Sequence, residues 1–509
     1  MNRISGLFLF CVWVMAAGCG GSGGAGGAGG GTGGSGGGNP GGGGSGAATH
    51  FSVVAPATAV AGTAISFTVT ALDAGNIAAT SYSGTVRFTS SDSAAVLPAD
   101  SALNLGGGTF NATFETGGVQ TLTVTDAMAA TIRGVSNAIQ TAATVGEFVA
   151  TGNMTVAREG HTATRLPNGK VLVTGGQNAT GVLASAEIFD PATGMFNATG
   201  NMGTARVGHT ATLLKDGTVF IAGGSADARA EIFTPASGTF APLKAFMETV
   251  RVGHTATLLN DGRVLLAGGG ESVGDLLQQG SGQNSASAEI FDPATRKFSP
   301  VANDMLTGRI NHTATLLSDG TVLLAGGSET VLTTLSFADV FSPATNSFST
   351  TAGEGTPAFF LAAASLQNGS VLLAGGEVIP KTTCTMGNTP NSTASSVVFD
   401  KTSMSFSDTG GMATPRTRHT ATALPDGTVL VTGGASGVTF CRGGRSATDF
   451  VSRSSAELFN PSIEMFTPNG SMTSARFGHT ATLLSNGNVL LAGGVDENGN
   501  TLASAELFR

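Results

Sequence analysis

The sequence is poor in charged residues and nearly lacks tyrosine and tryptophan. Lys, Arg, Asp and Glu make up 11% of its 509 residues, and the net charge is -9. Binding to nucleic acid phosphates needs a basic surface, so this composition argues against a nucleic-acid-binding protein. The only tryptophan is Trp13 and the only tyrosine is Tyr82, beside 29 Phe. Four cysteines in a chain of this length argue against a disulfide-dense scaffold.

Residues 1–19 have the features of a lipoprotein signal peptide. Arg3 precedes the apolar run 7–17, which is shorter than the about 20 residues of a membrane-spanning helix. Met15-Ala-Ala-Gly-Cys19 resembles the lipobox of bacterial lipoproteins, whose cysteine is acylated and becomes the mature N-terminus. The Gly-rich stretch 20–47 has the composition of a flexible tether. We therefore predict export and lipid anchoring through Cys19 at the bacterial outer membrane or cell surface; ordinary signal cleavage is the alternative.

Residues 48–144 show the period-two alternation of apolar residues that is typical of β-strands. It is clearest in 65–70, 86–89, 109–114 and 119–124. About seven short strands in a domain of this size fit a β-sandwich. The segment 82–92 resembles the Ig-like modules of bacterial surface proteins, which act as spacers or adhesive units. We predict an Ig-like β-sandwich that serves as a stalk, with ligand binding by this domain as the alternative.

Residues 145–509 contain one repeat written seven times. Repeats of this period, 45 to 60 residues, indicate a propeller or a solenoid. Each copy predicts four strands, a to d, with an Asn-Gly or Asp-Gly hairpin turn between a and b, and an apolar strand b. Strand c is Ala-Glu-Ile-Phe or a variant, and strand d starts at the next Phe. The Gly-Gly pair after strand b begins at Gly175, Gly223, Gly268, Gly326, Gly375, Gly433 and Gly493.

The repeat resembles the kelch repeat in its Arg-x-x-His motif, its Gly-Gly pair and its aromatic-Asp-Pro after strand c. The resemblance covers 145–509 and implies an all-β fold with a seven-bladed β-propeller. Phe stands where kelch repeats carry Tyr in strand c and Trp in strand d. The chain ends at strand c of the seventh copy, and 146–154 matches 194–202, which holds strand d of the first. The N-terminal strand in 146–154 is therefore expected to complete the last blade and leave no open sheet edge.

Six of the seven copies carry an arginine, a histidine and a carboxylate at fixed positions. Related by a near seven-fold axis, the histidines cannot converge on one metal ion. In the fifth copy the three positions are Ala358, Leu361 and Val397. The loss of all three polar residues together is expected if they form a buried network. A buried charge left without its partner is costly, whereas replacing the whole network by apolar residues is often neutral. We assign a structural role to Arg158, His161, Glu187, Arg206, His209, Glu231, Arg251, His254, Glu289, Arg309, His312, Asp339, Arg416, His419, Glu457, Arg476, His479 and Glu506.

The kelch resemblance extends to copper-radical oxidases such as galactose oxidase, and the residues argue against that activity here. Those enzymes need a Tyr cross-linked to Cys, further Tyr and His ligands and a stacking Trp, whereas 145–509 contains neither Tyr nor Trp. The segment 495–500 faintly resembles a calcium loop, but an Asn-Gly hairpin turn explains it as well. We predict no catalytic residue, no metal site and no cofactor.

Length variation among the copies falls between strands b and c, in the insertions 270–287, 377–395 and 435–454. These b–c loops share one face of the propeller, and loops on a rigid scaffold are where binding usually resides. Cys384 and Cys441 lie in loops of adjacent blades and are expected to form a disulfide in an exported protein; two free thiols are the alternative. The candidates for binding an anionic ligand or a glycan carboxylate are Arg442, Arg445 and Arg453.

Two functions remain. The favoured one is a monomeric, lipid-anchored binding or adhesion protein that recognises a protein or a glycan through the b–c loop face. The alternative is a carbohydrate-active enzyme (a hydrolase, lyase or epimerase), as some kelch-type propellers are. An enzyme is expected to gather carboxylates at the mouth of the central channel. The long loops instead scatter theirs over several blades, at Glu271, Asp275, Glu377, Asp449, Asp496 and Glu497.

Overall fold

The computed structural model describes residues 46–509 except 62, 115–117, 143–145, 273–283, 331–332, 336, 352, 354–357, 379–388, 391 and 443–444. The side chains of 142, 330, 333–334, 389–390, 438–442 and 445–449 are not described either. The predicted lipidation site Cys19 and Cys384 therefore lie outside the described residues, as do the side chains of Cys441, Arg442 and Arg445. Every regular element of the described chain is a β-strand, which confirms the predicted all-β fold. Among these residues there is no helix of the length and apolarity that crossing a membrane requires.

The N-terminal strands pack as sheets around one core. Alternate residues of β3 (Ala64–Leu72) point inward, so that Phe67 and Val69 meet Phe51, Phe88 and Val124. One sheet is β1 (His50–Val54), β3 and β6 (Gly107–Thr113); another is β5 (Ser101–Ala102), β4 (Thr85–Ser90), β8 (Leu122–Asp126) and β9 (Arg133–Val135); a third is β2 (Thr58–Val60), β10 (Ile139–Ala142) and β7 (Gly118–Gln120). That this N-terminal domain is Ig-like stays a prediction.

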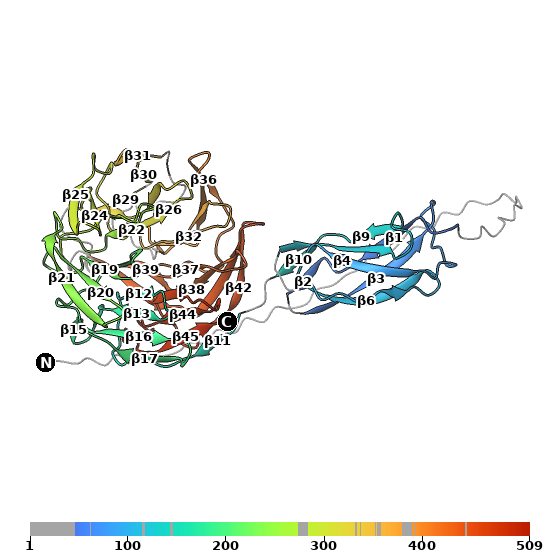
Figure 1. The fold of residues 1–509 in the computed structure, drawn as a ribbon, viewed down its shortest axis with the longest axis horizontal. Coiled ribbons are helices and arrows are strands. Elements are labelled where there is room, and N and C mark those ends of the chain that lie inside the picture. Colours follow the sequence, from blue (N-terminus) through green and yellow to red (C-terminus); the bar gives the residue numbers. More distant parts are fainter. Residues whose placement is uncertain are drawn as a thin grey trace, which may run out of the picture.

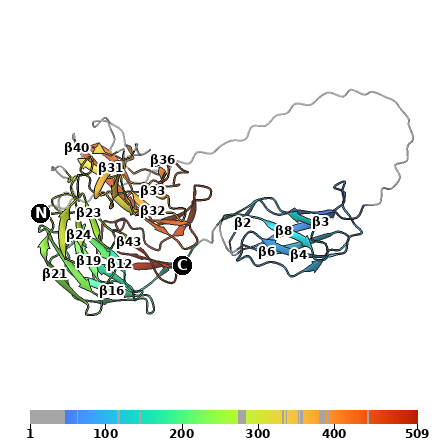
Figure 2. The ribbon, with the colours of Figure 1, turned by 45° about the horizontal axis from the view of Figure 1, so that its top comes forward.

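Seven four-stranded antiparallel sheets form a ring in the rest of the chain (Figures 1 and 2). Their innermost strands contact one another in succession around the closed ring. The first three blades are β12 (Thr162–Arg165), β13 (Val171–Thr174), β16 (Ala186–Asp190) and β17 (Met195–Ala198); β18 (Thr210–Leu213), β19 (Val219–Ala222), β20 (Arg229–Thr234) and β21 (Thr239–Phe246); β22 (Thr255–Leu258), β23 (Val264–Ala267), β24 (Ala288–Asp292) and β25 (Lys297–Pro300).

The remaining four blades repeat the same order of strands. They are β26 (Thr313–Leu316), β27 (Val322–Ala325), β30 (Asp339–Ser342) and β31 (Ser347–Thr350); β32 (Ala362–Ser365), β33 (Val371–Ala374), β35 (Ser396–Asp400) and β36 (Ser405–Asp408); β37 (Thr420–Ala423), β38 (Val429–Thr432), β41 (Ser455–Asn460) and β42 (Met465–Ser471); and β43 (Thr480–Leu483), β44 (Val489–Ala492), β45 (Ala505–Phe508) and β11 (Phe148–Ala150).

The repeated residues account for the blade geometry. Strand b, as in β19, is buried at every position because blades cover both of its faces. The a–b turn places Gly217 at φ 83°, the left-handed region that glycine tolerates at little cost. Phe of strand c pairs with Phe of strand d, as for Phe189 and Phe196 with ring centroids 4.9 Å apart. These phenylalanines therefore belong to the core between blades.

The last blade is completed by the strand that precedes the first. β11 runs antiparallel to β45, with Phe148 opposite Phe508 and their ring centroids 5.1 Å apart. The amides of Glu147 and Arg509 each donate to the other residue's carbonyl, at 3.2 and 3.0 Å. Both ends of the ring thus share one sheet, and no blade has an unpaired strand c.

Three small sheets lie in the b–c loops. They are β14 (Gln177–Asn178) with β15 (Gly181–Val182), β28 (Ser328–Thr330) with β29 (Thr333–Thr334), and β34 (Thr389–Pro390) with β39 (Ala435–Arg442) and β40 (Arg445–Ser452). The third joins loops of the fifth and sixth blades, and Figure 1 places the label of β39 near the centre of the ring.

Candidate functional site

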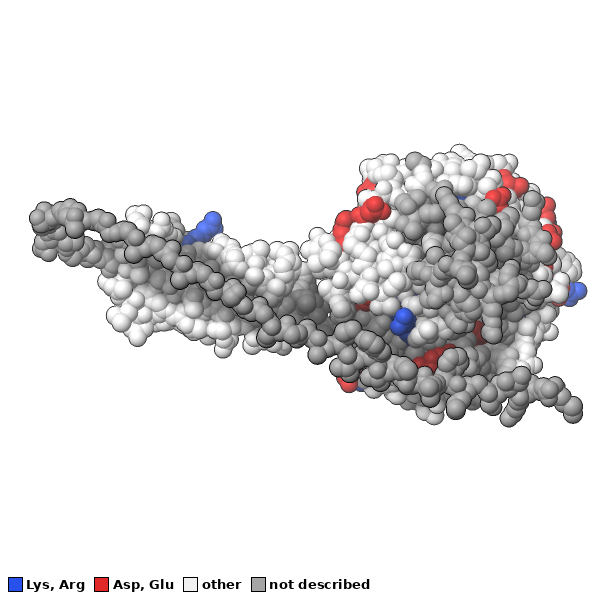
Figure 3. Space-filling model, turned by 180° about the vertical axis from the view of Figure 1, so that it is seen from behind, with Lys and Arg blue, Asp and Glu red and all other residues white. Residues whose placement is uncertain are grey.

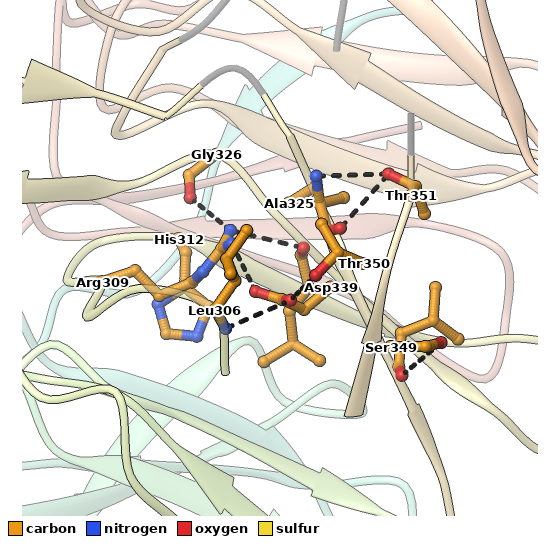
Figure 4. Close-up of polar contacts among 12 residues, drawn as sticks. Leu306, Arg309, His312, Ala325, Gly326, Asp339, Ser349, Thr350 and Thr351 are labelled. Atoms are coloured by element: carbon orange, nitrogen blue, oxygen red, sulfur yellow. Dashed lines mark hydrogen bonds and ion pairs between the residues drawn. The ribbon is translucent and has the colours of Figure 1, made fainter. Parts of the chain in front are cut away.

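In six of the seven repeats, the arginine and the carboxylate form a buried ion pair. In the second blade, Arg206 is fully buried, and its Nη2 lies 3.0 Å from Oε1 of Glu231 while Nη1 donates to the carbonyl of Gly223 at 2.7 Å. Glu231 also accepts from the amide of Gly203 at 2.7 Å. Figure 4 shows the version with aspartate, in which Asp339 lies 2.6 Å from Arg309. The other pairs are Arg158–Glu187, Arg251–Glu289, Arg416–Glu457 and Arg476–Glu506, at 2.8 to 3.0 Å.

The side chains of the histidines contact other partners than the arginine–carboxylate pair. The ring of His209 reaches the preceding blade, where Nε2 lies 3.1 Å from both Thr162 Oγ1 and Thr174 Oγ1. The histidine therefore joins two blades, whereas the arginine joins segments within one. Equivalent contacts are His161–Thr480 at 3.0 Å, His254–Thr210 at 3.1 Å, His312–Thr255 at 2.9 Å and His479–Thr420 at 3.3 Å.

The fifth blade replaces both systems by apolar packing. Ala358, Leu361 and Val397 are buried in one cluster with the strands of the fourth and fifth blades. Thr313, which faces Leu361 instead of a histidine, donates to the carbonyl of Ala325 at 3.4 Å. Ala362 stands where the other blades present a threonine to the next histidine, so no threonine hydroxyl reaches the ring of His419 among the described residues.

Replacing Glu231 by alanine is expected to lower the free energy of unfolding by about 3–5 kcal/mol, because the buried guanidinium of Arg206 loses its partner. The triple variant Arg206→Ala, His209→Leu, Glu231→Val copies the fifth blade and is expected to lose less. Thr162 and Thr174 remain satisfied in it, since their hydroxyls already lie 2.7 Å apart. Urea unfolding of both variants measures the difference; an equal or larger loss in the triple variant contradicts the pairing argument.

A cavity of about 390 Å³ lies at the mouth of the central channel. Its rim is formed by one residue from each blade, the one that directly precedes the repeat's histidine, or that precedes Leu361 in the fifth blade. The backbone amide of each rim residue after Gly160 donates to the carbonyl of the rim residue of the preceding blade. Six such bonds, of 2.9 to 3.3 Å, connect Gly160, Gly208, Gly253, Asn311, Phe360, Arg418 and Gly478 in that order. This rim and the b–c loops share a face, because Thr417 pairs with Ala435, and Phe359 with Glu377, across it.

Arg418 is the cation of this cavity. Its guanidinium lies over the ring of Phe360, 4.3 Å from the centroid, and 5.4 Å from that of Phe450 on β40. Its Nε is buried and has no hydrogen-bond partner among the described residues. Burial lowers the pKa of Arg418, and the charges of Glu377 and Glu159 oppose that shift. Glu377 is itself nearly fully buried, which raises its pKa.

The histidines that line the channel carry no charge at neutral pH. Burial lowers the pKa of His209 from 6.5 to about 3, and the charge of Arg206 adds to this shift. The same causes act at His254, His312, His419 and His479, which also line the cavity. The charged residues of the described cavity wall are therefore Arg418 and Glu159.

The residues predicted from the loops are placed as follows. Arg453 lies at the end of the β39–β40 hairpin, where Nε donates to Ser436 Oγ at 3.0 Å. Arg442 and Arg445 face each other at the hairpin tip through their backbones. Asp496, of the calcium-like segment, accepts from the amides of Asn498 and Asn500 at 2.8 Å, as in a tight turn.

Sequence reasoning missed Arg418 and Phe360. Their signal was available in the repeat alignment, since both stand where four copies have glycine. What the sequence alone does not reveal is that this repeat position lines the channel.

The predicted disulfide has a testable basis in the pairing of the two loops. Thr389 lies opposite Thr439 in the β34–β39 ladder, so the loops that carry Cys384 and Cys441 meet. Mature protein is expected to show no free thiol from this pair without reduction. Reduction is expected to lower the free energy of unfolding by about 2–4 kcal/mol. Thiol labelling followed by mass spectrometry reads this out, with Cys441→Ser as control; two labelled cysteines in unreduced protein contradict the disulfide.

Comparison with known proteins supports the architecture. No family model matches the sequence, and no curated protein does. A solved structure of a fungal alcohol oxidase of the AA5 family, in complex with copper, is similar with a TM-score of 0.57 and 18% identity, over 72% of this chain and 76% of the oxidase. YjhT aligns with a TM-score of 0.44 and 14% identity, over 70% of this chain and 96% of its own. The oxidase likeness shows a shared fold, and the predicted β-propeller is confirmed.

The residues do not fit the copper of that oxidase. The only tyrosine of the chain, Tyr82, lies in the N-terminal sandwich, where its hydroxyl donates to Asp126. Each channel histidine belongs to a different blade, and in five of the six a threonine hydroxyl contacts Nε2. No cluster of three or more His, Cys, Asp or Glu suited to a metal occurs among the described residues.

Proposed function

We propose that this protein is a lipid-anchored surface protein whose propeller binds a ligand at the b–c face. The observation that carries the proposal is the contrast between repeated and unrepeated residues at the channel mouth. The repeated Arg, His and carboxylate side chains bond to one another or to neighbouring blades. Arg418, Phe360 and Asn311 are unrepeated and line the cavity. Side chains not needed by the scaffold are thus gathered where a ligand has access.

The N-terminal segments support the anchored arrangement. The lipobox-like sequence ending at Cys19 supplies a site for acylation. The Gly-rich stretch 20–47 has the composition of a flexible linker that would connect the acylated cysteine to the folded domains. We propose that the following sandwich is an Ig-like spacer that separates the propeller from the membrane. The protein acts as a monomer at the bacterial outer membrane or cell surface, and its ligand is a protein or a glycan.

Binding is favoured over a carbohydrate-active enzyme by the carboxylates of the cavity. Glycosidic bond hydrolysis commonly uses a pair of carboxyl groups about 5–10 Å apart on either side of the substrate. Of the described residues that line the cavity, Glu159 alone carries a carboxylate. Its Oε1 accepts from Gln177 at 3.1 Å, which suits a fixed acceptor better than a proton-transfer group.

Two measurements test the proposed function. Purified full-length protein is applied to arrays of glycans and of bacterial and host surface proteins, where specific binding is expected. Growth with an alkyne-tagged fatty acid is expected to label the wild type and not Cys19→Ser. Absence of any specific array signal contradicts ligand binding, and equal labelling of both proteins contradicts the anchor.

A further inference from the structure

The channel-mouth cavity holds two opposite charges that do not neutralise each other directly. Arg418 and Glu159 both line it. The guanidinium of Arg418 contacts the faces of Phe360 and Phe450, whereas the carboxylate of Glu159 accepts a hydrogen bond from Gln177. We propose that the cavity binds a small zwitterionic group, with its carboxylate on Arg418 and its ammonium on Glu159. This inference rests on the proposed function, because it names the chemistry of the ligand at that face.

The backbone conformation of Arg418 indicates that its side chain has a role other than stabilising the fold. Its φ is 53°, in the left-handed region, and four of the equivalent positions are glycines at φ 60° to 64°. A side chain in this region is energetically costly, and such residues cluster at active sites and ligand-binding segments. Non-glycine residues with positive φ also occur in exposed c–d turns, such as Arg296 and Glu464. The non-glycine residues with positive φ at the rim, by contrast, line a cavity: Asn311, Phe360 and Arg418.

The guanidinium is held by aromatic faces and keeps hydrogen-bonding capacity. Contact with Phe360 and Phe450 stabilises the cation through the ring quadrupoles without using any N–H group. Within the described part of the chain the buried Nε of Arg418 has no acceptor, and leaving such a donor unsatisfied is costly. A ligand carboxylate supplies the missing acceptor, and the planar fork of an arginine matches it in two-point fashion.

The negative charges near Arg418 decide against a simple anion. Glu159 Oε2 lies beside Gly478 of the rim, 3.9 Å from where a Cβ on that glycine would be. Glu377 is not part of the cavity lining, but its carboxyl group interacts electrostatically with Arg418. A plain carboxylate is therefore repelled by Glu159, while an ammonium on the same molecule turns that repulsion into attraction.

The size and the remaining wall limit the ligand. About 390 Å³ accommodates a small molecule or one terminal unit of a polymer. The wall histidines are neutral and Asn311 is uncharged, so no other charge of the described wall competes with Arg418 and Glu159. On the one face that Figure 3 shows, the visible basic and acidic side chains are scattered.

Three probes with one carbon skeleton test the proposal: 4-aminobutyrate, butyrate and butylammonium. Binding to the full-length protein is measured by calorimetry and by the shift of ligand NMR signals. The zwitterion is expected to bind about tenfold or more tightly than either single-charge probe, since a hydrogen bond to a charged group contributes about 1.5–3 kcal/mol. Arg418→Gly is expected to abolish the advantage over butylammonium, and Glu159→Gln the advantage over butyrate.

Arg418→Gly copies the residue of four other blades, so it is expected to keep or raise the melting temperature while it loses binding. Arg418→Gln is a second variant that keeps a side chain at the rim, and Arg263→Gly on an exposed a–b turn is the matched control. No binding of any probe, equal affinity for the zwitterion and butyrate, or unchanged binding by Arg418→Gly overturns the zwitterion site. Array binding that survives in Arg418→Gly overturns this site alone and leaves the proposed function standing.

Discussion

On acidification from pH 7, the propeller is expected to unfold cooperatively at about pH 4 to 5, because six buried histidines must become protonated. The folded-state pKa of His161, His209, His254 and His419 is lowered from 6.5 to about 3 by burial and by the neighbouring arginines, and that of His312 and His479 is well below 6.5. At a pH between the lowered folded-state pKa values and the unfolded value of 6.5, the unfolded chain binds more protons than the folded protein does. The stability contribution is thus complete above about pH 6.5 and is lost as the pH falls toward 3.

The effect is large because the contributions add. Each histidine gives a slope of about 1.4 kcal/mol per pH unit once the unfolded state is protonated. Six of them over two pH units amount to roughly 17 kcal/mol, at least as large as the whole stability of a typical domain. Circular dichroism along a pH titration, with the melting temperature at each pH, measures this.

His419→Leu provides the matched control for the acid transition. It copies Leu361 and leaves no threonine without its partner, since Ala362 faces it. Its acid midpoint is expected to move to lower pH, with one fewer proton taken up on unfolding. A melting temperature that stays constant from pH 7 to pH 4 shows that the histidines are not neutral and buried as described.

A chain that begins at Thr155 is expected to lose about 7–10 kcal/mol of folding free energy relative to one that begins at Gly146. The missing residues include β11, which completes the seventh blade, and the buried Met154. A net value of about 1 kcal/mol for each backbone hydrogen bond and about 2–5 kcal/mol for the methionine gives this range. Outside the β11–β45 ladder itself, the bonds counted are Glu147–Arg509, Arg509–Glu147, Thr151–Ala505, Gly152–Gly194 and Met154–Ala503.

The comparison isolates the closing strand, because both chains lack the sandwich. The shorter chain also exposes the edge of β45, whose free amides and carbonyls favour association with other molecules. Thermal melting and light scattering measure both consequences. Equal melting temperatures for the two chains show that the ring holds without β11 and contradict the closure argument.

The repeated part of the fold was predictable because each feature is local and is written several times. The Asp-Gly turn before Thr218 requires positive φ, and the apolar run 219–222 requires burial on both faces. Closure followed from comparing 146–154 with 194–202, since a strand missing at one end was present at the other. The paired arginine and carboxylate were indicated by their joint loss in the fifth copy.

The histidine's role was not predictable in the same way. His209 bonds to Thr162, which is 47 residues away and belongs to the neighbouring blade. A repeat read one copy at a time shows both residues but not that they meet across a boundary. The fifth blade did indicate that the histidine and the threonine meet across a blade boundary, because Ala362 replaces the threonine that His419 would otherwise face.

The candidate site depends on the tertiary structure most of all. A single substitution of glycine by Arg418 has no evident meaning until ring closure brings seven rim positions together. Phe450 comes from a hairpin that begins after strand b, and it lies near Arg418 only because β40 folds back along β39. The sequence by itself determined the blades, their number and their closure, since those follow from periodicity and turn chemistry. Tertiary structure alone decided which unrepeated side chains share the channel mouth, because that depends on the curvature of the ring and on loops from different blades.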